Sequence, residues 1–252
     1  MSRNMLCLVA LAVLVSFSSF SLAQNQTVKT ARQQGGSQSG LNTALLTGCS
    51  NCFAYGGDLD PNSASANGLA SEKDLIVSDA EVSWAVIVPP GHSATVEMIA
   101  ANFLTAGCVA DPQQADWDIR IGVSSGNGGT VIASGTDSIA IGPTGRIAFG
   151  LIECRVTLTL PQAMSLSAGT YFFGVVPYCT NSGNSTCSGQ RFFLSDSTGK
   201  PPIGGKTYVP QNDSFFNSGF FGATWAPTWG LSGQCGGIGC NRFSAGLIGT
   251  PN

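Results

Sequence analysis

Short apolar runs, some of them alternating with polar residues, recur at near-regular spacing between residues 74 and 195. Clusters of Gly, Pro, Ser and Asn separate them at 89–91, 124–129, 142–145 and 167–169 and predict turns there. Short strands punctuated in this way are typical of an antiparallel sandwich or barrel. The predicted strands are 74–78, 83–89, 94–104, 116–123, 130–134, 138–142, 154–161, 170–178 and 191–195.

The alternation is clearest in the predicted strand 116–123. One face carries Trp117, Ile119, Ile121 and Val123, and the other carries Asp116, Asp118 and Arg120, because successive side chains of a strand point to opposite faces. We expect a packed face and a wet face.

Helical periodicity is nearly absent after residue 24. Only residues 63–71 form a weak helix candidate, and no internal repeat or second composition break follows residue 45. The pattern therefore predicts an all-β chain with a single antiparallel β-sandwich domain at 45–252. The polar segment 24–44, rich in Gln, Gly and Ser over 24–40, is interpreted as a flexible leader.

The first 23 residues have the organisation of a secretory signal peptide. Arg3 precedes a mostly apolar stretch at 6–20, and the small-residue motif at 21–23 predicts cleavage before Gln24. No later segment reaches the roughly 20 apolar residues that a membrane span needs. We expect a protein that is exported to the extracellular space or cell surface and has no membrane span.

Cleavage at this point would remove Cys7 and leave eight cysteines, and an even number in an exported chain indicates disulfides. A zinc site is disfavoured because it usually takes four Cys or His ligands and the chain has one histidine. A redox dithiol is disfavoured because its cysteines normally begin a helix. Spacing alone leaves the connectivity open, and the simplest pairing is Cys49–Cys52, Cys108–Cys154, Cys179–Cys187 and Cys235–Cys240.

Charged residues make up only 10% of the chain, and the net charge is −3. Globular proteins average about 25% charged residues. No basic patch is visible, which argues against nucleic acid as a partner.

The middle of the chain also carries a resemblance. The segments DWDIRIGVSSGNGGTVIASG (116–135), IGPTGRIAFG (141–150), CRVTLTLPQAMSLSAGTYFFGVVP (154–177) and RFFLSDSTG (191–199) resemble a loosely defined group of secreted bacterial β-sandwich proteins. The match covers roughly residues 80–200, and its motifs are structural. The resemblance implies a jelly-roll-like sandwich and export, and it supplies no catalytic residues.

Asp58, Asp60 and Asn62 have the D-x-D-x-N spacing that begins a calcium loop. The rest departs from an EF-hand, which would have Gly and Glu where this chain has Ser63 and Leu69. These residues are candidate calcium ligands, with ordinary turn chemistry as the alternative.

Aromatic residues are concentrated at 212–230. Phe220, Phe221, Trp225 and Trp229 lie among Gly, Asn, Ser and Pro, and rings held on a loop can stack on sugars. The alternative is a packed core, because aromatic side chains are usually buried.

Three functions stay open on the sequence. The first is a non-catalytic binding or adhesion module for a polysaccharide or cell-surface glycan, using the loop aromatics. The second is a structural subunit of an extracellular assembly, in which the leader adds as a strand to a neighbouring copy and the chain self-associates. The third is a hydrolase that uses acidic residues, with Asp116 and Asp118 as its candidate pair.

Overall fold

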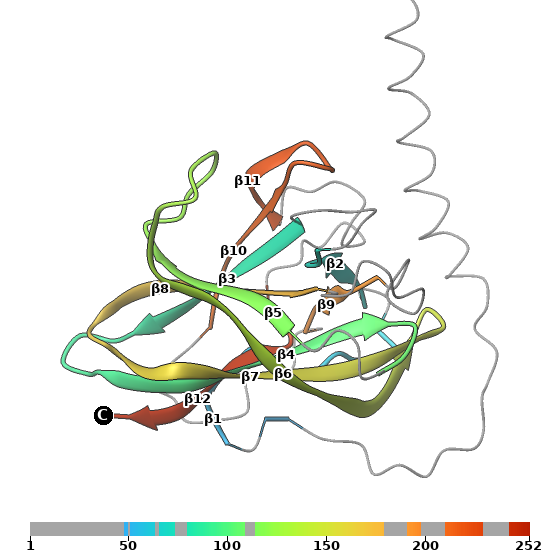
Figure 1. Ribbon diagram of the computed structural model, residues 1–252, viewed down its shortest axis with the longest axis horizontal. Coiled ribbons are helices and arrows are strands. Elements are labelled where there is room, and N and C mark those ends of the chain that lie inside the picture. Colours follow the sequence, from blue (N-terminus) through green and yellow to red (C-terminus); the bar gives the residue numbers. More distant parts are fainter. Residues whose placement is uncertain are drawn as a thin grey trace, which may run out of the picture. The chain divides into compact units, whose positions relative to one another are not determined.

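The strands form a single hydrogen-bonded network (Figure 1). The computed structural model describes residues 48–49, 51–63, 66–73, 80–108, 114–178, 191–197, 210–228 and 242–252, all within one compact unit, Asn42–Asn252. The strands are β1 (Cys52–Tyr55), β2 (Gly68–Ala70), β3 (Ala80–Val88), β4 (Ala94–Thr105), β5 (Gln114–Ile121), β6 (Thr130–Ala148), β7 (Leu151–Leu166), β8 (Gly169–Tyr178), β9 (Phe193–Ser195), β10 (Pro210–Ser218), β11 (Ala223–Pro227) and β12 (Ala245–Pro251). Across these ranges no α-helix is present, so the all-β prediction is confirmed.

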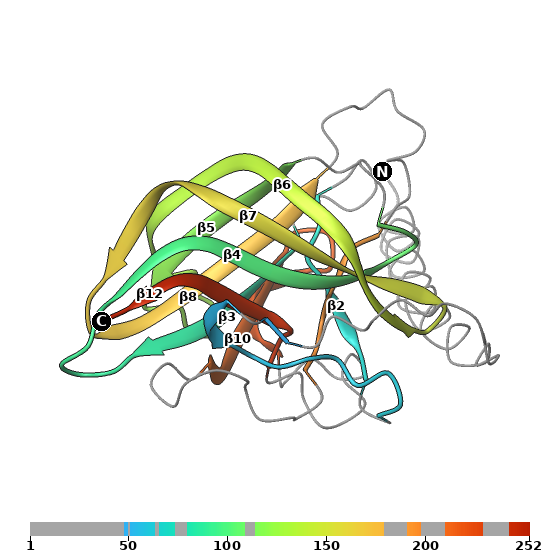
Figure 2. The same ribbon diagram turned by 90° about the horizontal axis from the view of Figure 1, so that it is seen from below.

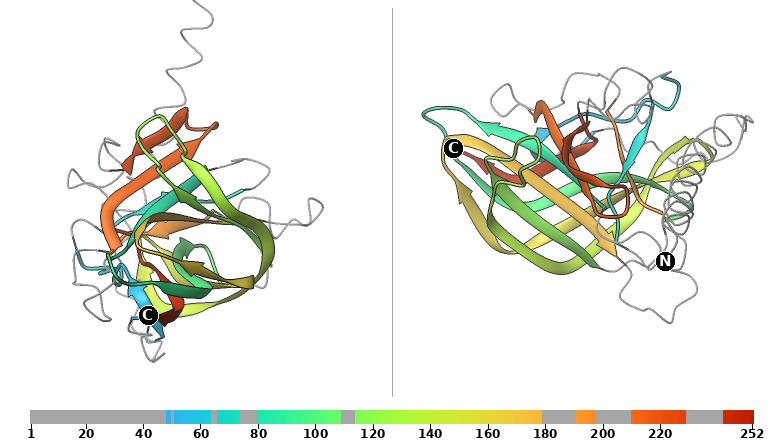
Figure 3. Two further views of the ribbon diagram at one scale, coloured as in Figure 1. Left: turned by 90° about the vertical axis from the view of Figure 1, so that its left-hand side faces the viewer. Right: turned by 90° about the horizontal axis from the view of Figure 1, so that it is seen from above.

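Every strand pairing within this network is antiparallel. The main path runs β1-β12-β4-β7-β6-β5-β8-β3-β10-β11, and β9 pairs with both β2 and β4. The long strand β6 joins two parts of the sheet, because residues up to Ser138 pair with β5 while those from Ile139 pair with β7. The sheet is therefore strongly curled (Figures 2 and 3). The expected division into two separate sheets is not confirmed, since hydrogen bonds run continuously from one part to the other.

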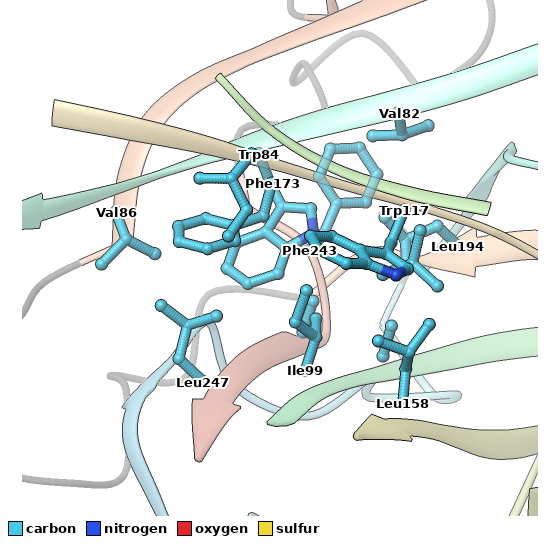
Figure 4. Packing of buried hydrophobic residues seen from close by; sticks show 14 of the residues in the cluster. Val82, Trp84, Val86, Ile99, Trp117, Leu158, Phe173, Leu194, Phe243 and Leu247 are labelled. Carbon is cyan, nitrogen blue, oxygen red and sulfur yellow. The ribbon is translucent and has the colours of Figure 1, made fainter. Parts of the chain in front are cut away.

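The core lies between the two parts of the curled sheet. Trp84 of β3 stacks on Phe173 of β8 with ring centroids 5.2 Å apart. From the other part, Ile99, Leu158 and Leu247 enter the same buried cluster (Figure 4). Burial of these apolar surfaces is the main stabilising contribution to the fold.

The predicted strands from 83 to 195 are present, with one correction. Residues 130–134 and 138–142 lie in one strand, β6, which continues through the turn expected at 142–145. The register shifts between Pro143 and Ile147, and Gly145 adopts φ +87°, so this segment is a bulge in the strand and not a reversal. The chain reverses instead at Phe149 and Gly150, which both have positive φ, as a tight two-residue hairpin requires.

The helix candidate at 63–71 is wrong. Gly68–Ala70 forms β2, which pairs with β9, so strand pairing overrides a weak local period. The predictions for 1–44 and for the strand at 74–78 lie outside the described residues. In the part of the chain that is described, no helix is both long and apolar enough to span a membrane.

Candidate functional site

Trp225 does not form an exposed aromatic platform. Only 9% of the residue is exposed, and it packs with Val123 and Phe172 on the outer face of the sheet. The Arg120 guanidinium lies 4.5 Å from the centroid of its ring. Of the two alternatives for this residue, the structure therefore has the packed one.

The hairpin loop between β5 and β6 lies beside the β10–β11 hairpin (Figure 3), and it contacts Trp225 of β11. Gly126 N donates to Trp225 O at 3.2 Å, and a β-carbon added at Gly128 would lie 2.5 Å from the indole. Trp225 also adopts φ +44°, a conformation that is rare for a bulky residue and that its packing must maintain. The glycine-rich loop thus allows close approach to the indole and closes over it.

The other aromatic candidates differ in exposure. Phe220 is 49% exposed at the turn between β10 and β11, and it meets Phe221 edge to face at 4.9 Å. Phe221 is partly buried against the main core. Trp229 lies outside the described residues. One exposed phenyl ring at a turn is a small surface for stacking on a sugar.

The candidate calcium ligands have protein partners. Asp58 accepts hydrogen bonds from the Tyr55 hydroxyl at 2.6 Å and from Gly48 N at 2.8 Å, and Arg146 Nη2 lies 3.3 Å from Asp58 Oδ1. Asp60 Oδ1 accepts from Asn62 N at 3.0 Å, as in the turn alternative. The contacts of Asp58 are thus mainly with hydrogen-bond donors and a cationic side chain, and calcium binding stays a prediction.

Two of the expected disulfides are formed. Cys49 pairs with Cys52 in a short loop, and Cys108 pairs with Cys154 of β7. Both pairings are confirmed. The cysteines of the other two expected pairs, Cys179, Cys187, Cys235 and Cys240, lie outside the described residues.

A polar hollow lies on the outer face of β3, β8, β5 and β6, and we name it the acid cleft. It has a volume of about 370 Å³, within the range of small-molecule sites. Its lining consists of Glu81, Asp116, Trp117, Asp118, Ser134, Gly135, Thr136, Gly174 and Val176.

Strand register brings these residues together. Gly174 of β8 pairs with Ser83 of β3 on one side and with Asp118 of β5 on the other. Because Gly174 has no side chain, neighbouring side chains can come close to its backbone. Glu81 and Asp118 turn their carboxyl groups toward it: a β-carbon at 174 would lie 2.5 Å from Glu81 Oε1 and 2.8 Å from Asp118 Oδ1.

The two carboxyl groups are buried and close together. Asp118 is 8% exposed, and the Glu81 side chain is 15% exposed. Glu81 Oε1 and Asp118 Oδ1 can hydrogen-bond to each other when one carboxyl is protonated, and within the described ranges neither has a hydrogen bond to any other group. Unpartnered buried oxygens are costly, and a proton shared between the two groups relieves this cost.

Arg120 distinguishes the two acids. Its Nη2 and Nε lie 2.5 and 2.6 Å from Asp118 Oδ2, whereas its Nε is 3.9 Å from Glu81 Oε1. Burial, followed by the charge of Asp118, raises the pKa of Glu81 from its ordinary 4.5 to about 8. Burial also raises the pKa of Asp118, against the opposing effect of Arg120. The ion pair favours the charge on Asp118 and the proton on Glu81.

The rim of the cleft is more polar and more accessible. The Thr136 hydroxyl donates to Asp116 Oδ1 at 2.5 Å, and Lys73 Nζ lies 3.1 Å from Asp116 Oδ2. Thr136 and Ser134 are exposed. Donors and acceptors are therefore arranged around a glycine floor.

The sequence reasoning identified one half of this site. Asp116 and Asp118 do share the outer face of β5, but Asp118 is buried and not wet, and its close partner is Glu81. Glu81 precedes the predicted strand 83–89, and no spacing rule links it to Asp118. The signal available in the sequence was Glu81 itself, a charged residue at the start of the otherwise mostly apolar segment that forms β3.

No group of three or more His, Cys, Asp and Glu side chains that could hold a metal ion occurs in the described segments. Comparison with protein-family models finds no match, and comparisons with curated proteins and with solved structures find no significant match. The resemblance to secreted bacterial β-sandwich proteins thus stays a prediction.

Proposed function

We propose that this protein is an exported, non-catalytic module that binds a hydroxyl-rich ligand, a glycan, in the acid cleft. In this proposal the curled sheet acts as a jelly-roll-like sandwich, a rigid support for a site on its outer face. The loop aromatics have a secondary role in this proposal because Trp225 is packed.

The observation that carries the proposal is a polar hollow whose floor holds the close carboxyl pair Glu81 and Asp118. A carboxyl group can accept several hydrogen bonds, so two of them at the floor of a cleft favour a ligand that supplies donors. Sugar hydroxyls both donate and accept. The rim offers matching groups in Asp116, Ser134 and Thr136.

The strands that line the cleft also favour a preformed binding site, which need not rearrange when a ligand binds. β8 pairs with both β3 and β5, so the floor is held by hydrogen bonds on both sides. A site built on a rigid sheet loses little conformational entropy when the ligand binds.

The test is titration calorimetry with soluble β-1,4-linked oligosaccharides of glucose, xylose, mannose and glucosamine. Thr136→Val removes a rim hydroxyl at nearly constant volume, and we expect it to weaken binding at least threefold. Thr130→Val is the matched control, because Thr130 is exposed on the same strand and lies outside the cleft lining. If none of these sugars binds the parent protein, the proposed function is wrong; equal binding by both variants would place the site elsewhere.

A hydrolase is the second candidate, and the Glu81–Asp118 pair favours it. A protonated carboxyl beside an ionised one is the arrangement from which general acid and base roles are made. Release of reducing ends from an oligosaccharide, lost in Glu81→Gln and retained in Thr130→Val, would establish this activity. Binding without release would favour the module.

A further inference from the structure

We infer that Asn127 is a site of self-catalysed deamidation, in which the backbone nitrogen of Gly128 attacks the side-chain amide of the asparagine. This reaction is independent of the proposed function. The chain contains two Asn–Gly pairs, 67–68 and 127–128. Both pairs have the local sequence that the reaction needs, because a glycine leaves the attacking nitrogen unhindered. Their structural settings differ and select one of them.

The side-chain amide of Asn127 is held and polarised by the loop. Asn127 is exposed in the hairpin loop between β5 and β6, so base and water can reach it. Its Oδ1 accepts a hydrogen bond from Gly129 N at 2.9 Å, which keeps the amide close to the backbone. This donor also stabilises the negative charge that develops on Oδ1 when a nucleophile adds to the adjoining carbon. The loop therefore provides a small oxyanion site for the attack.

The attacking nitrogen is available. Within the described segments the Gly128 N–H donates no hydrogen bond. Ser124 N donates to Asn127 O at 2.9 Å, and this bond withdraws charge from the peptide group that contains the Gly128 nitrogen, which favours its deprotonation. Packing also requires glycine at this position, since a β-carbon at 128 would lie 2.5 Å from the Trp225 indole. The fold thus retains beside Asn127 the residue type that hinders the reaction least.

The Asn67–Gly68 pair has the opposite setting. Gly68 N donates to Asn67 Oδ1 at 2.8 Å, so the proton of the attacking nitrogen is engaged with the amide oxygen. Gly68 begins β2 and pairs with Ser195 of β9, and Asn67 O accepts from Asp196 N at 3.0 Å. Ring closure must break these contacts. We therefore expect the folded structure to protect Asn67.

The reaction needs only base and water. A base removes the proton of the Gly128 nitrogen, this nitrogen bonds to Cγ of Asn127, and the Cγ–Nδ2 bond breaks as Nδ2 takes a proton and leaves as ammonia. Water then opens the cyclic succinimide at either carbonyl. The product is aspartate or isoaspartate, and in isoaspartate the main chain runs through the side-chain carbons. Either product adds a carboxylate to the loop that contacts Trp225.

The experiment incubates the parent protein at pH 6 and pH 8, both folded and in urea. Tandem mass spectrometry locates the change from amide to acid, and enzymatic methylation measures total isoaspartate. In the folded protein we expect Asn127 to react roughly tenfold faster than Asn67, and faster at pH 8 because the attacking form is the deprotonated nitrogen. In urea the two sites should react at similar rates, since only the shared Asn–Gly sequence remains.

Two variants confirm the location. Asn127→Gln keeps an amide but would have to close a larger ring, so the isoaspartate formed by the folded protein should fall to nearly none. Asn67→Gln is the matched control and should keep the parent yield. Equal rates at the two asparagines in the folded protein, or isoaspartate that persists in Asn127→Gln, would overturn the assignment. A preference for Asn127 that survives in urea would show that local sequence selects the site, and would overturn the role given to the fold.

Discussion

Replacing Glu81 by glutamine should change how the stability of the protein depends on pH. Burial and the nearby Asp118 carboxylate raise the pKa of Glu81 from 4.5 to about 8. The folded protein therefore holds this proton more tightly than the unfolded chain does. The stabilisation is fully present below pH 4.5 and is lost as the pH rises through about 8.

The magnitude follows from the size of the shift. One pKa unit corresponds to about 1.4 kcal/mol, so the full shift corresponds to about 5 kcal/mol as an upper bound. Asp118 shares the proton, so the pair carries this free energy jointly. We expect the free energy of unfolding of the parent protein to fall by about 2 to 5 kcal/mol, relative to Glu81→Gln, between pH 4.5 and pH 9.

Urea unfolding followed by tryptophan fluorescence, at steps across this pH range, measures the difference. Asp196, whose pKa burial raises to about 7, titrates in both proteins, so its contribution largely cancels when the two profiles are subtracted. Glu97→Gln, which changes an exposed carboxyl on β4, should follow the parent profile. Parallel profiles for the parent and Glu81→Gln would refute the shared-proton description of the cleft.

Three further results are expected. Replacing Cys108 and Cys154 together by alanine should lower the free energy of unfolding by about 4 kcal/mol in urea, because this bond closes a loop with a sequence separation of 46; an unchanged midpoint would contradict the stabilising role of this bond. In the same assay Trp225→Ala should cost about 3 kcal/mol and the exposed Phe220→Ala under about 1 kcal/mol, whereas equal costs would show that Trp225 is not packed as described. Asp58→Asn should cost about 2 kcal/mol equally in calcium and in chelator, because protein donors hold that carboxylate, and a cost seen only with calcium present would reveal a bound cation.

Local patterns in the sequence identified most of the central strands. In the segment 116–123 the alternation predicted a packed face, and the structure places Trp117 and Ile119 of that face in the core. The prediction is wrong at the end of the segment, where Ile121 is 41% exposed and Val123 packs outside the main core, in a cluster with Trp225. Alternation succeeds because it records which face of a strand is buried, a property of the strand itself. The pairings Cys49–Cys52 and Cys108–Cys154 were also identified correctly.

The sequence was less informative where a segment depends on its partner. Residues 68–70 form the strand β2 because they pair with β9. Near Gly145 the chain forms a bulge within β6, where a turn was expected. Trp225 lies in a stretch of turn residues where the sequence left exposure and packing both open, and the β5–β6 loop and Arg120 decide the matter by contacting it. These outcomes depend on neighbours that are distant along the chain.

The acid cleft shows the same division. The sequence by itself determined that Asp116, Asp118 and Arg120 share one face of a strand. Only the tertiary structure decided that β8 lies between β3 and β5, so that Gly174 opens a space into which both Glu81 and Asp118 extend. The physical reason is that the two-residue period of a strand specifies the face of each side chain, while the order and register of the strands depend on how the whole chain packs.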